Sequence, residues 1–282
     1  MSDILDNLIK IKSLLEAGDL ISVRSACAQT LQEHPDNAQV LEILGVVSNA
    51  IAQDEAKRVF KGPSYRDWLQ HIHDFIEPRG YVEIGVADGG SLSLASPSTR
   101  AIGVDPQFMI SHQISAWAKI YKKESDQFFM DHDPKEILGG DFLDFAFIDG
   151  LHTFDQALRD FINIEKESHY KTVVAFHDIY PVEPITANRQ RLTQFWLGDT
   201  WKVIPIIRKY RPELMVFTIP TFPSGLGIVT GLDPNSSVLE DNLDDIVASY
   251  MNNLDEDVLS LEKHLNIKEN KFEIFDEVMR EL

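Results

Sequence analysis

The chain has 282 residues, more than one typical domain, and 44% of them are hydrophobic, which is enough to bury a sizeable core. Its formal net charge of −19 argues against nucleic-acid backbones or anionic membranes as partners, because both are bound by an excess of Lys and Arg. The single cysteine, Cys27, excludes an internal disulfide, and no apolar run approaches the length of a membrane span, so we expect a cytoplasmic protein.

Residues 1–58 are predicted to form three helices separated by the turns Ala17-Gly18-Asp19 and Pro35-Asp36-Asn37. The order A-G-D-L, P-D-N-A and L-x-x-L-G resembles one and a half tetratricopeptide repeats, although the large aromatics of that pattern are absent. Such repeats usually need three or more copies. We therefore expect this segment to pack on the next domain, on a second copy of the chain or on a protein partner; a plain helical extension that completes the fold is the alternative.

A glycine-rich stretch, Y-V-E-I-G-V-A-D-G-G-S, follows an amphipathic helix predicted for Tyr65–Ile76. Its first four residues are typical of a buried strand in a parallel sheet. Gly85, Gly89 and Gly90 then form a loop whose backbone can approach a ligand, and the amides that open a following helix would offer free donors.

A second short strand, 101–104, ends in Asp105. A carboxylate at this position can accept hydrogen bonds from a ribose diol, as in dinucleotide-binding sheets. The NAD fingerprint G-x-G-x-x-G is not matched, because Ala87 occupies its middle position, and this counts against a pyrophosphate ligand.

The pattern E-x-G-x-x-x-G with an acid at the end of the second strand resembles motif I of the class I S-adenosylmethionine-dependent methyltransferases. The resemblance implies that the loop lines the cofactor and that Asp105 holds its ribose hydroxyls. By position, the cofactor-lining residues would be Glu83, Gly85, Val86, Gly89 and Ser91. A tight strand-to-helix turn without a ligand is the alternative.

After Asp105 we expect a helix over 114–123 and a third strand over 127–130. Asp131 follows that strand, at a position where the methyltransferase family often has a polar contact to adenine. The neighbouring His132 and Asp133 are interpreted as solvated loop residues rather than as a metal site.

Two further strands, 143–148 and 172–176, end in D-G-L-H and H-D respectively, with a helix over 153–167 between them. Loops at the carboxyl ends of parallel strands share one crevice. Asp149, His152, His177 and Asp178 should therefore converge beside the glycine-rich loop.

The segments F-I-D-G-L-H-T-F-D-Q-A-L-R-D and F-H-D-I-Y-P resemble the metal-dependent O-methyltransferases of small molecules and glycans, the branch related to catechol and macrocin O-methyltransferases. The resemblance implies that Asp149, His177 and Asp178 hold Mg²⁺ or Mn²⁺ and that His152 is the catalytic base. His177 departs from the family, which has an oxygen ligand there, and three alternatives stay open: His177 lies behind the metal ligands, the metal is softer than Mg²⁺, or no metal is bound.

Beyond Pro181 the predicted elements are a helix over 191–196 and strands over 201–208, 214–219 and 226–230. Aromatic and basic residues of this region are candidates for an acceptor pocket, although such residues are more often core or rim: Trp196, Trp201, Arg208, Tyr210 and Arg211. Residues 233–282 carry a net charge of −10 and are predicted to form acidic helices over 241–251, 255–265 and 272–282.

The sequence thus predicts a tetratricopeptide-like segment (1–58), an α/β, Rossmann-like methyltransferase domain (59–232) with a parallel sheet and an antiparallel closing strand, and an acidic helical tail (233–282). The expected activity is transfer of a methyl group from S-adenosylmethionine to a hydroxyl of a sugar, glycan or secondary metabolite. Two alternatives stay open. His152, His177 and Asp178 could form the iron site of an oxygenase, or the α/β domain could be a scaffold or cofactor sensor for partners bound by the helices.

Overall fold

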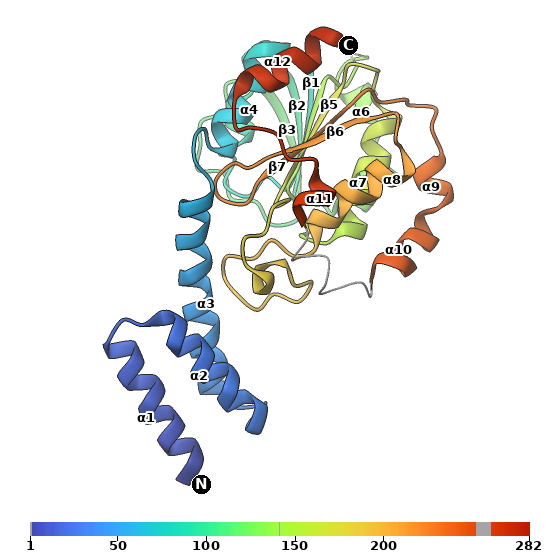
Figure 1. Cartoon of the computed structure of the whole chain (residues 1–282). Coiled ribbons are helices and arrows are strands. Elements are labelled where there is room, and N and C mark those ends of the chain that lie inside the picture. The colour runs from blue at the N-terminus through green and yellow to red at the C-terminus, as the bar shows by residue number, and fades with distance from the viewer. Residues whose placement is uncertain (1, 141, 252–260) are drawn as a thin grey trace.

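The computed structural model describes residues 2–140, 142–251 and 261–282. Its centre is a seven-stranded sheet with the order β3-β2-β1-β4-β5-β7-β6, covered by helices on both faces (Figure 1). The strands are β1 (Gly80–Ile84), β2 (Arg100–Val104), β3 (Trp117–Tyr121), β4 (Phe145–Ile148), β5 (Val173–His177), β6 (Met215–Ile219) and β7 (Leu226–Thr230). Strands β1 to β5 pair in parallel and β7 is antiparallel to both neighbours, which confirms the predicted fold class.

Alternate residues of each strand feed two apolar layers, as the two-residue repeat of a strand requires. Val82 and Ile84 of β1 face one layer, and Tyr81 faces the other. The first layer is closed mainly by α7 (Phe154–Lys166) and α8 (Val203–Tyr210), and the second by α4 (Tyr65–Ile76) and α12 (Phe272–Glu281). The remaining helical elements of the α/β part are η1 (Leu92–Leu94), α5 (Ser125–Asp131), α6 (Pro134–Ile137), η2 (Pro184–Ala187), η3 (Thr200–Lys202), α9 (Val238–Asp241), α10 (Leu243–Met251) and α11 (Leu261–Leu265).

Three N-terminal helices form an arm that projects from the sheet domain (Figure 1). They are α1 (Ser2–Glu16), α2 (Leu20–Glu33) and α3 (Ala38–Val59). The Asp19 and Asn37 side chains cap α2 and α3 by accepting hydrogen bonds from backbone amides, as the predicted turns require. The arm has its own small core around Ile11, Val23 and Cys27.

Two predicted elements exchange type. Residues 114–123 were expected to be helical, but they contain β3, which pairs with β2 at the edge of the sheet. Residues 127–130 were expected to be a strand, but they lie in α5. A short apolar run fits the period of a helix and that of a strand equally well, so its packing partners decide which of the two it forms.

Three more predictions were wrong. The glycine-rich loop leads only into the three-residue η1, because eight residues interrupted by Pro97 separate Ser91 from Arg100 and leave no room for a longer helix. Residues 201–208 form η3 and α8 rather than a strand; Pro205 lies in the first turn, where the missing N–H has no intrahelical partner anyway. Residues 191–196 are irregular instead of helical.

The C-terminal helices α9, α10 and α12 agree with the prediction of helices in this region. Of the helix predicted over 255–265, residues 255–260 lie outside the described residues, and α11 covers the rest. Among the described residues, no helix combines the length and the apolar character needed to cross a membrane.

Candidate active site

A cavity of about 680 Å³ lies at the carboxyl ends of β1, β2, β4 and β5. Strand order reverses between β1 and β4, and ligands of open α/β sheets bind in the crevice at such a switch point. Residues from all four strand ends and from 194–196 line the cavity, among them Gly85, Asp105, Asp149, His152, His177, Asp178 and Trp196. The structure therefore brings together the residues that the two sequence motifs placed at neighbouring strand ends.

The glycine-rich loop packs directly against the loop after β4. Gly85 has a φ of 89°, and a Cβ there would lie 1.9 Å from the Asp149 carbonyl oxygen. Any side chain at this position would push the two loops apart. Gly85 is thus required for contact between the cofactor motif and the acidic motif, in addition to lining the cavity.

Asp105 lines the cavity and also holds the loop. One carboxylate oxygen accepts hydrogen bonds from the amides of Val86 and Ala87 at 2.9 and 2.8 Å, and the other accepts from the Gln107 amide at 2.6 Å. Each carboxylate oxygen has two lone pairs, so Oδ2 is fully used by the two loop amides, and Oδ1 can accept one further hydrogen bond from a hydroxyl of a diol.

Several residues expected at the cofactor lie behind the loop instead of in the cavity. Glu83 is fully buried and accepts hydrogen bonds from the hydroxyls of Tyr81 and Ser91. Burial raises the pKa of Glu83 to about 8, although those hydrogen bonds act in the opposite direction. Val86 is buried, and the positive φ of Gly89 accommodates a turn against Ile110. These residues support the loop.

Asp131 is not brought to the cavity. It ends α5 and forms a 2.7 Å ion pair with Lys123, because the strand expected before it is a helix. The cavity is lined there by Ser125 and Asp126, at the start of α5, and by Gln156 of α7. The Gln156 amide donates to both of those residues, a long-range contact for which the sequence carries no signal.

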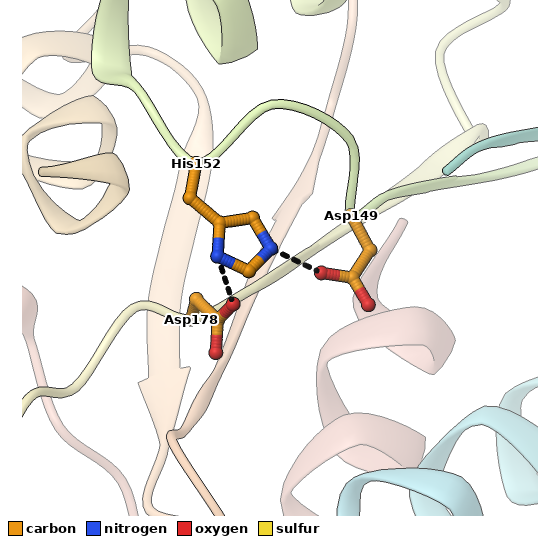
Figure 2. A group of neighbouring side chains, drawn as sticks. All are labelled: Asp149, His152 and Asp178. Atoms are coloured by element: carbon orange, nitrogen blue, oxygen red, sulfur yellow. Dashed lines mark ion pairs between the residues drawn. The ribbon is translucent and has the colours of Figure 1, made fainter. Parts of the chain in front are cut away.

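The acidic motif places an imidazole between two carboxylates (Figure 2). His152 Nε2 lies 3.5 Å from Asp149 Oδ1, and its Nδ1 lies 3.1 Å from Asp178 Oδ2. The Trp196 carbonyl oxygen is also 2.9 Å from His152 Nδ1, which indicates that this nitrogen carries a proton. Asp178 has a φ of 58°, a left-handed conformation that is uncommon outside glycine and clusters at functional sites.

His177 supports this cluster from behind. Its Nδ1 lies 3.2 Å from Asp149 Oδ2, and its Nε2 lies 3.2 Å from the Ser224 hydroxyl. The ring of Tyr65 packs on the imidazole with centroids 4.2 Å apart. Both nitrogens of His177 thus have protein partners.

The cluster balances its charges internally. Burial disfavours the imidazolium of His152, but the negative charges of Asp178 and Asp149 outweigh this effect and raise its pKa to about 10. The same balance raises the pKa of His177. Burial alone would raise the pKa of Asp149, yet the two histidines hold it well below its usual range. At neutral pH His152 is therefore charged and can accept a proton only after the charge of its carboxylate partners is compensated.

A metal ion fits the cluster, with one change from the expected ligands. One ligand atom each from Asp149, His152 and Asp178 lie within 4.8 Å of one another. The sequence-based set had His177 in place of His152. Two carboxylates and one imidazole suit Mn²⁺ or a similar ion better than Mg²⁺, which prefers oxygen alone. An iron oxygenase would use His152, His177 and Asp178, but the ligand atoms that lie close together here belong to Asp149, His152 and Asp178.

Of the residues considered for an acceptor pocket, only Trp196 lines the cavity. Trp201 is buried in the core, and Arg211 is buried in an ion pair with Glu165 at 2.7 Å. Arg208 donates to the His264 carbonyl, and Tyr210 packs at the edge of the core. Gln194, Phe195 and Pro223 also line the cavity; the irregular backbone of 188–199 kept the first two from being predicted, and Pro223 comes from the loop between β6 and β7.

Comparison with known proteins supports one assignment. Residues 82–179 match the family model of a methyltransferase domain. That region runs from the middle of β1 to the residue after Asp178, so it holds both motifs of the cavity. No curated protein matches the sequence.

Two solved structures illustrate the similarity. The O-methyltransferase TomG from Streptomyces achromogenes, described as involved in tomaymycin synthesis and in complex with S-adenosylmethionine, is 12% identical, with 65% of this chain and 89% of that chain covered and a TM-score of 0.48. An O-methyltransferase from Bacillus cereus, in complex with S-adenosylhomocysteine, is 13% identical, with 72% and 96% covered and a TM-score of 0.43. These similarities are too low to assign any residue of the site.

Proposed function

We propose that the protein is an S-adenosylmethionine-dependent O-methyltransferase that acts on a hydroxyl of a sugar, glycan or secondary metabolite. One observation carries the proposal: Asp105 and the Asp149–His152–Asp178 cluster line the same cavity, at the switch point of a sheet whose central region matches a methyltransferase domain. A diol-binding carboxylate and an acid–base cluster are the two groups that the reaction needs.

The cofactor is proposed to lie over the carboxyl ends of β1 and β2. Asp105 accepts hydrogen bonds from its ribose, and Gly85 lets the loop approach it closely. The sulfonium is already an activated electrophile, so the residues around it have to position rather than activate the methyl group.

The acceptor hydroxyl is proposed to lie between the methyl group and the cluster. A hydroxyl is a weak nucleophile because it is almost fully protonated at pH 7, and His152 is the group placed to take its proton. Asp178 and the Trp196 carbonyl fix the orientation of its ring by accepting from Nδ1, which leaves Nε2 to accept the hydroxyl proton once the imidazolium has lost its own Nε2 proton to solvent. Alignment of oxygen and methyl carbon supplies much of the remaining acceleration.

A divalent cation held by the carboxylates of Asp149 and Asp178 would lower the pKa of a hydroxyl in contact with it and would leave Nε2 of His152 free to act as the base. It would also compensate the carboxylate charges that keep the His152 imidazole protonated. The chain itself supplies the ligands, the aromatic wall of Phe195 and Trp196 for a ring-shaped acceptor, and the exclusion of water by that wall.

The direct test is a methyl-transfer assay. The protein is incubated with methyl-labelled S-adenosylmethionine, with and without Mn²⁺, against a panel of phenols, sugars, amines and thiols, and products are identified by mass spectrometry. We expect a product that carries the labelled methyl group on oxygen. Binding of S-adenosylmethionine without transfer to any hydroxyl in the panel, together with transfer to amine or thiol acceptors, would contradict O-methylation.

A further inference from the structure

The acceptor side of the cavity is closed by residues 188–199, a segment with no helix or strand of its own. Within the segment, the amides of Leu197 and Gly198 donate to the Thr186 carbonyl at 2.9 and 3.1 Å. Gln194, Phe195 and Trp196 face the cavity. Because little regular hydrogen bonding fixes this backbone, its position depends on the groups packed against it.

The segment holds His152 on its inner side. The Trp196 carbonyl oxygen lies 2.9 Å from His152 Nδ1, and the two rings stack with centroids 5.3 Å apart. The backbones are equally close, since a Cβ on Gly198 would lie 1.7 Å from the His152 carbonyl oxygen. Any shift of the segment therefore changes the surroundings of His152.

The N-terminal arm holds the same segment on its outer side. The Asn49 side chain of α3 accepts a 2.6 Å hydrogen bond from the Phe195 amide. One turn earlier, Gly45 lets the helix approach, because a Cβ there would lie 3.3 Å from the Leu192 carbonyl oxygen. Arg24 of α2 pairs with Glu183 at 2.9 Å, just before η2. In Figure 1 the yellow loops of this region lie beside the middle of α3.

We propose that Asn49 is a positioning residue of the active site and that the N-terminal arm supports the acceptor wall from outside instead of acting only as a separate docking module. Asn49 fixes the Phe195 backbone, the Phe195–Trp196 wall fixes His152, and the arm thereby sets the geometry of the proposed base. Only the statement that this wall faces the acceptor rests on the proposed function. The contacts between Asn49, the wall and His152 do not depend on that function.

The test compares three variants of the full chain. Asn49→Ala removes the acceptor for the Phe195 amide, and Asn49→Asp keeps an oxygen in the same place. Gln53→Ala, at an exposed position one turn along α3, is the matched control. Two readouts follow the chain of contacts: hydrogen exchange of the Phe195 amide, and diethyl pyrocarbonate modification of His152 relative to the exposed His112, both read by peptide mass spectrometry.

Loss of one hydrogen bond, about 1 kcal/mol, corresponds to about five-fold faster exchange. We expect that increase at Phe195 in Asn49→Ala, together with faster modification of His152 and unchanged modification of His112. Asn49→Asp and Gln53→Ala should behave like the unchanged protein. Unchanged exchange at Phe195, or faster exchange with unchanged His152, would overturn the proposal.

Two further measurements keep the result interpretable. Should Asn49→Ala fail to fold, Arg24→Ala breaks the other contact of the arm with this region, a partly exposed ion pair to Glu183, and the same two readouts then decide. S-adenosylmethionine titration of each variant is expected to give unchanged affinity, because the cofactor side is untouched. If the unchanged protein did not bind S-adenosylmethionine, the proposed function would be contradicted. The exchange and modification results would still decide the role of Asn49.

Discussion

The two sides of the cavity are assembled differently. On the β1–β2 side, the side chains of Glu83 and Asp105 take their hydrogen bonds from residues 81–107, as when Asp105 caps the loop amides. The β4–β5 side joins Asp149 and Asp178 to the 194–196 wall and, through Asn49, to a helix 146 positions away. The cofactor side is therefore held mainly by local hydrogen bonds, whereas the acceptor side depends on contacts between distant parts of the chain.

The largest effect is expected from the acceptor side. Replacing His152 with Ala removes the proposed base, and turnover should fall by about 100- to 10,000-fold. Affinity for S-adenosylmethionine should change little, because His152 belongs to the other side of the cavity. Kinetics with an acceptor from the screen and titration with the cofactor measure the two quantities. His112→Ala, at an exposed histidine, is the control, and equal turnover of both variants would remove His152 from the mechanism.

The next effect tests the point where the two sides meet. Gly85→Ala places a Cβ against the Asp149 backbone, and overpacking with a positive φ should cost about 3 kcal/mol or more of unfolding free energy. Gly18→Ala shares a positive φ but meets no atom within 4 Å, so it should lose only about 1 kcal/mol. Urea unfolding compares them. Equal losses would mean that the loops are free to separate.

A smaller effect is expected on the cofactor side alone. Asp105→Ala removes the diol acceptor and leaves the amides of Val86 and Ala87 without their carboxylate. Affinity for S-adenosylmethionine should fall by about 10- to 100-fold, the range for a hydrogen bond to a charged group. Calorimetric titration measures it, with Asp133→Ala at another capping position as control. The rate of diethyl pyrocarbonate modification of His152 should be the same as in the unchanged protein. A changed rate would show that the cofactor side and the acceptor side of the cavity are coupled.

The last prediction concerns pH, and its effect is small for each pH unit. The pKa of His152 is about 10 in the folded state against about 6.5 for an unperturbed histidine. The charged imidazole therefore contributes its full stabilisation below pH 6.5, loses it as pH rises from 6.5 to 10, and contributes none above. We measure the free energy of unfolding in urea at several pH values. Over this window it should fall more steeply for the unchanged protein than for His152→Gln, by about 1 kcal/mol per pH unit at most. Parallel slopes would show that the carboxylates do not hold the proton.

The difference between the two sides also explains what the sequence could predict. Asp149, His152, His177 and Asp178 end neighbouring buried strands, and the rule for parallel sheets places such ends together. Asp131 was misplaced because F-F-M fits a strand and a helix equally well, and only its packing in α5 decides. The Phe195–Trp196 wall could not be predicted, because residues 188–199 carry no periodic pattern and their contacts, such as the hydrogen bond from the Phe195 amide to Asn49, join distant parts of the chain.

The most direct test of the account is calorimetric titration of the purified protein with S-adenosylmethionine and, separately, with NAD, each with and without Mn²⁺. The account predicts micromolar binding of S-adenosylmethionine under both conditions and no comparable binding of NAD. Failure to bind S-adenosylmethionine under either condition would contradict the assignment of this cavity to methyl transfer.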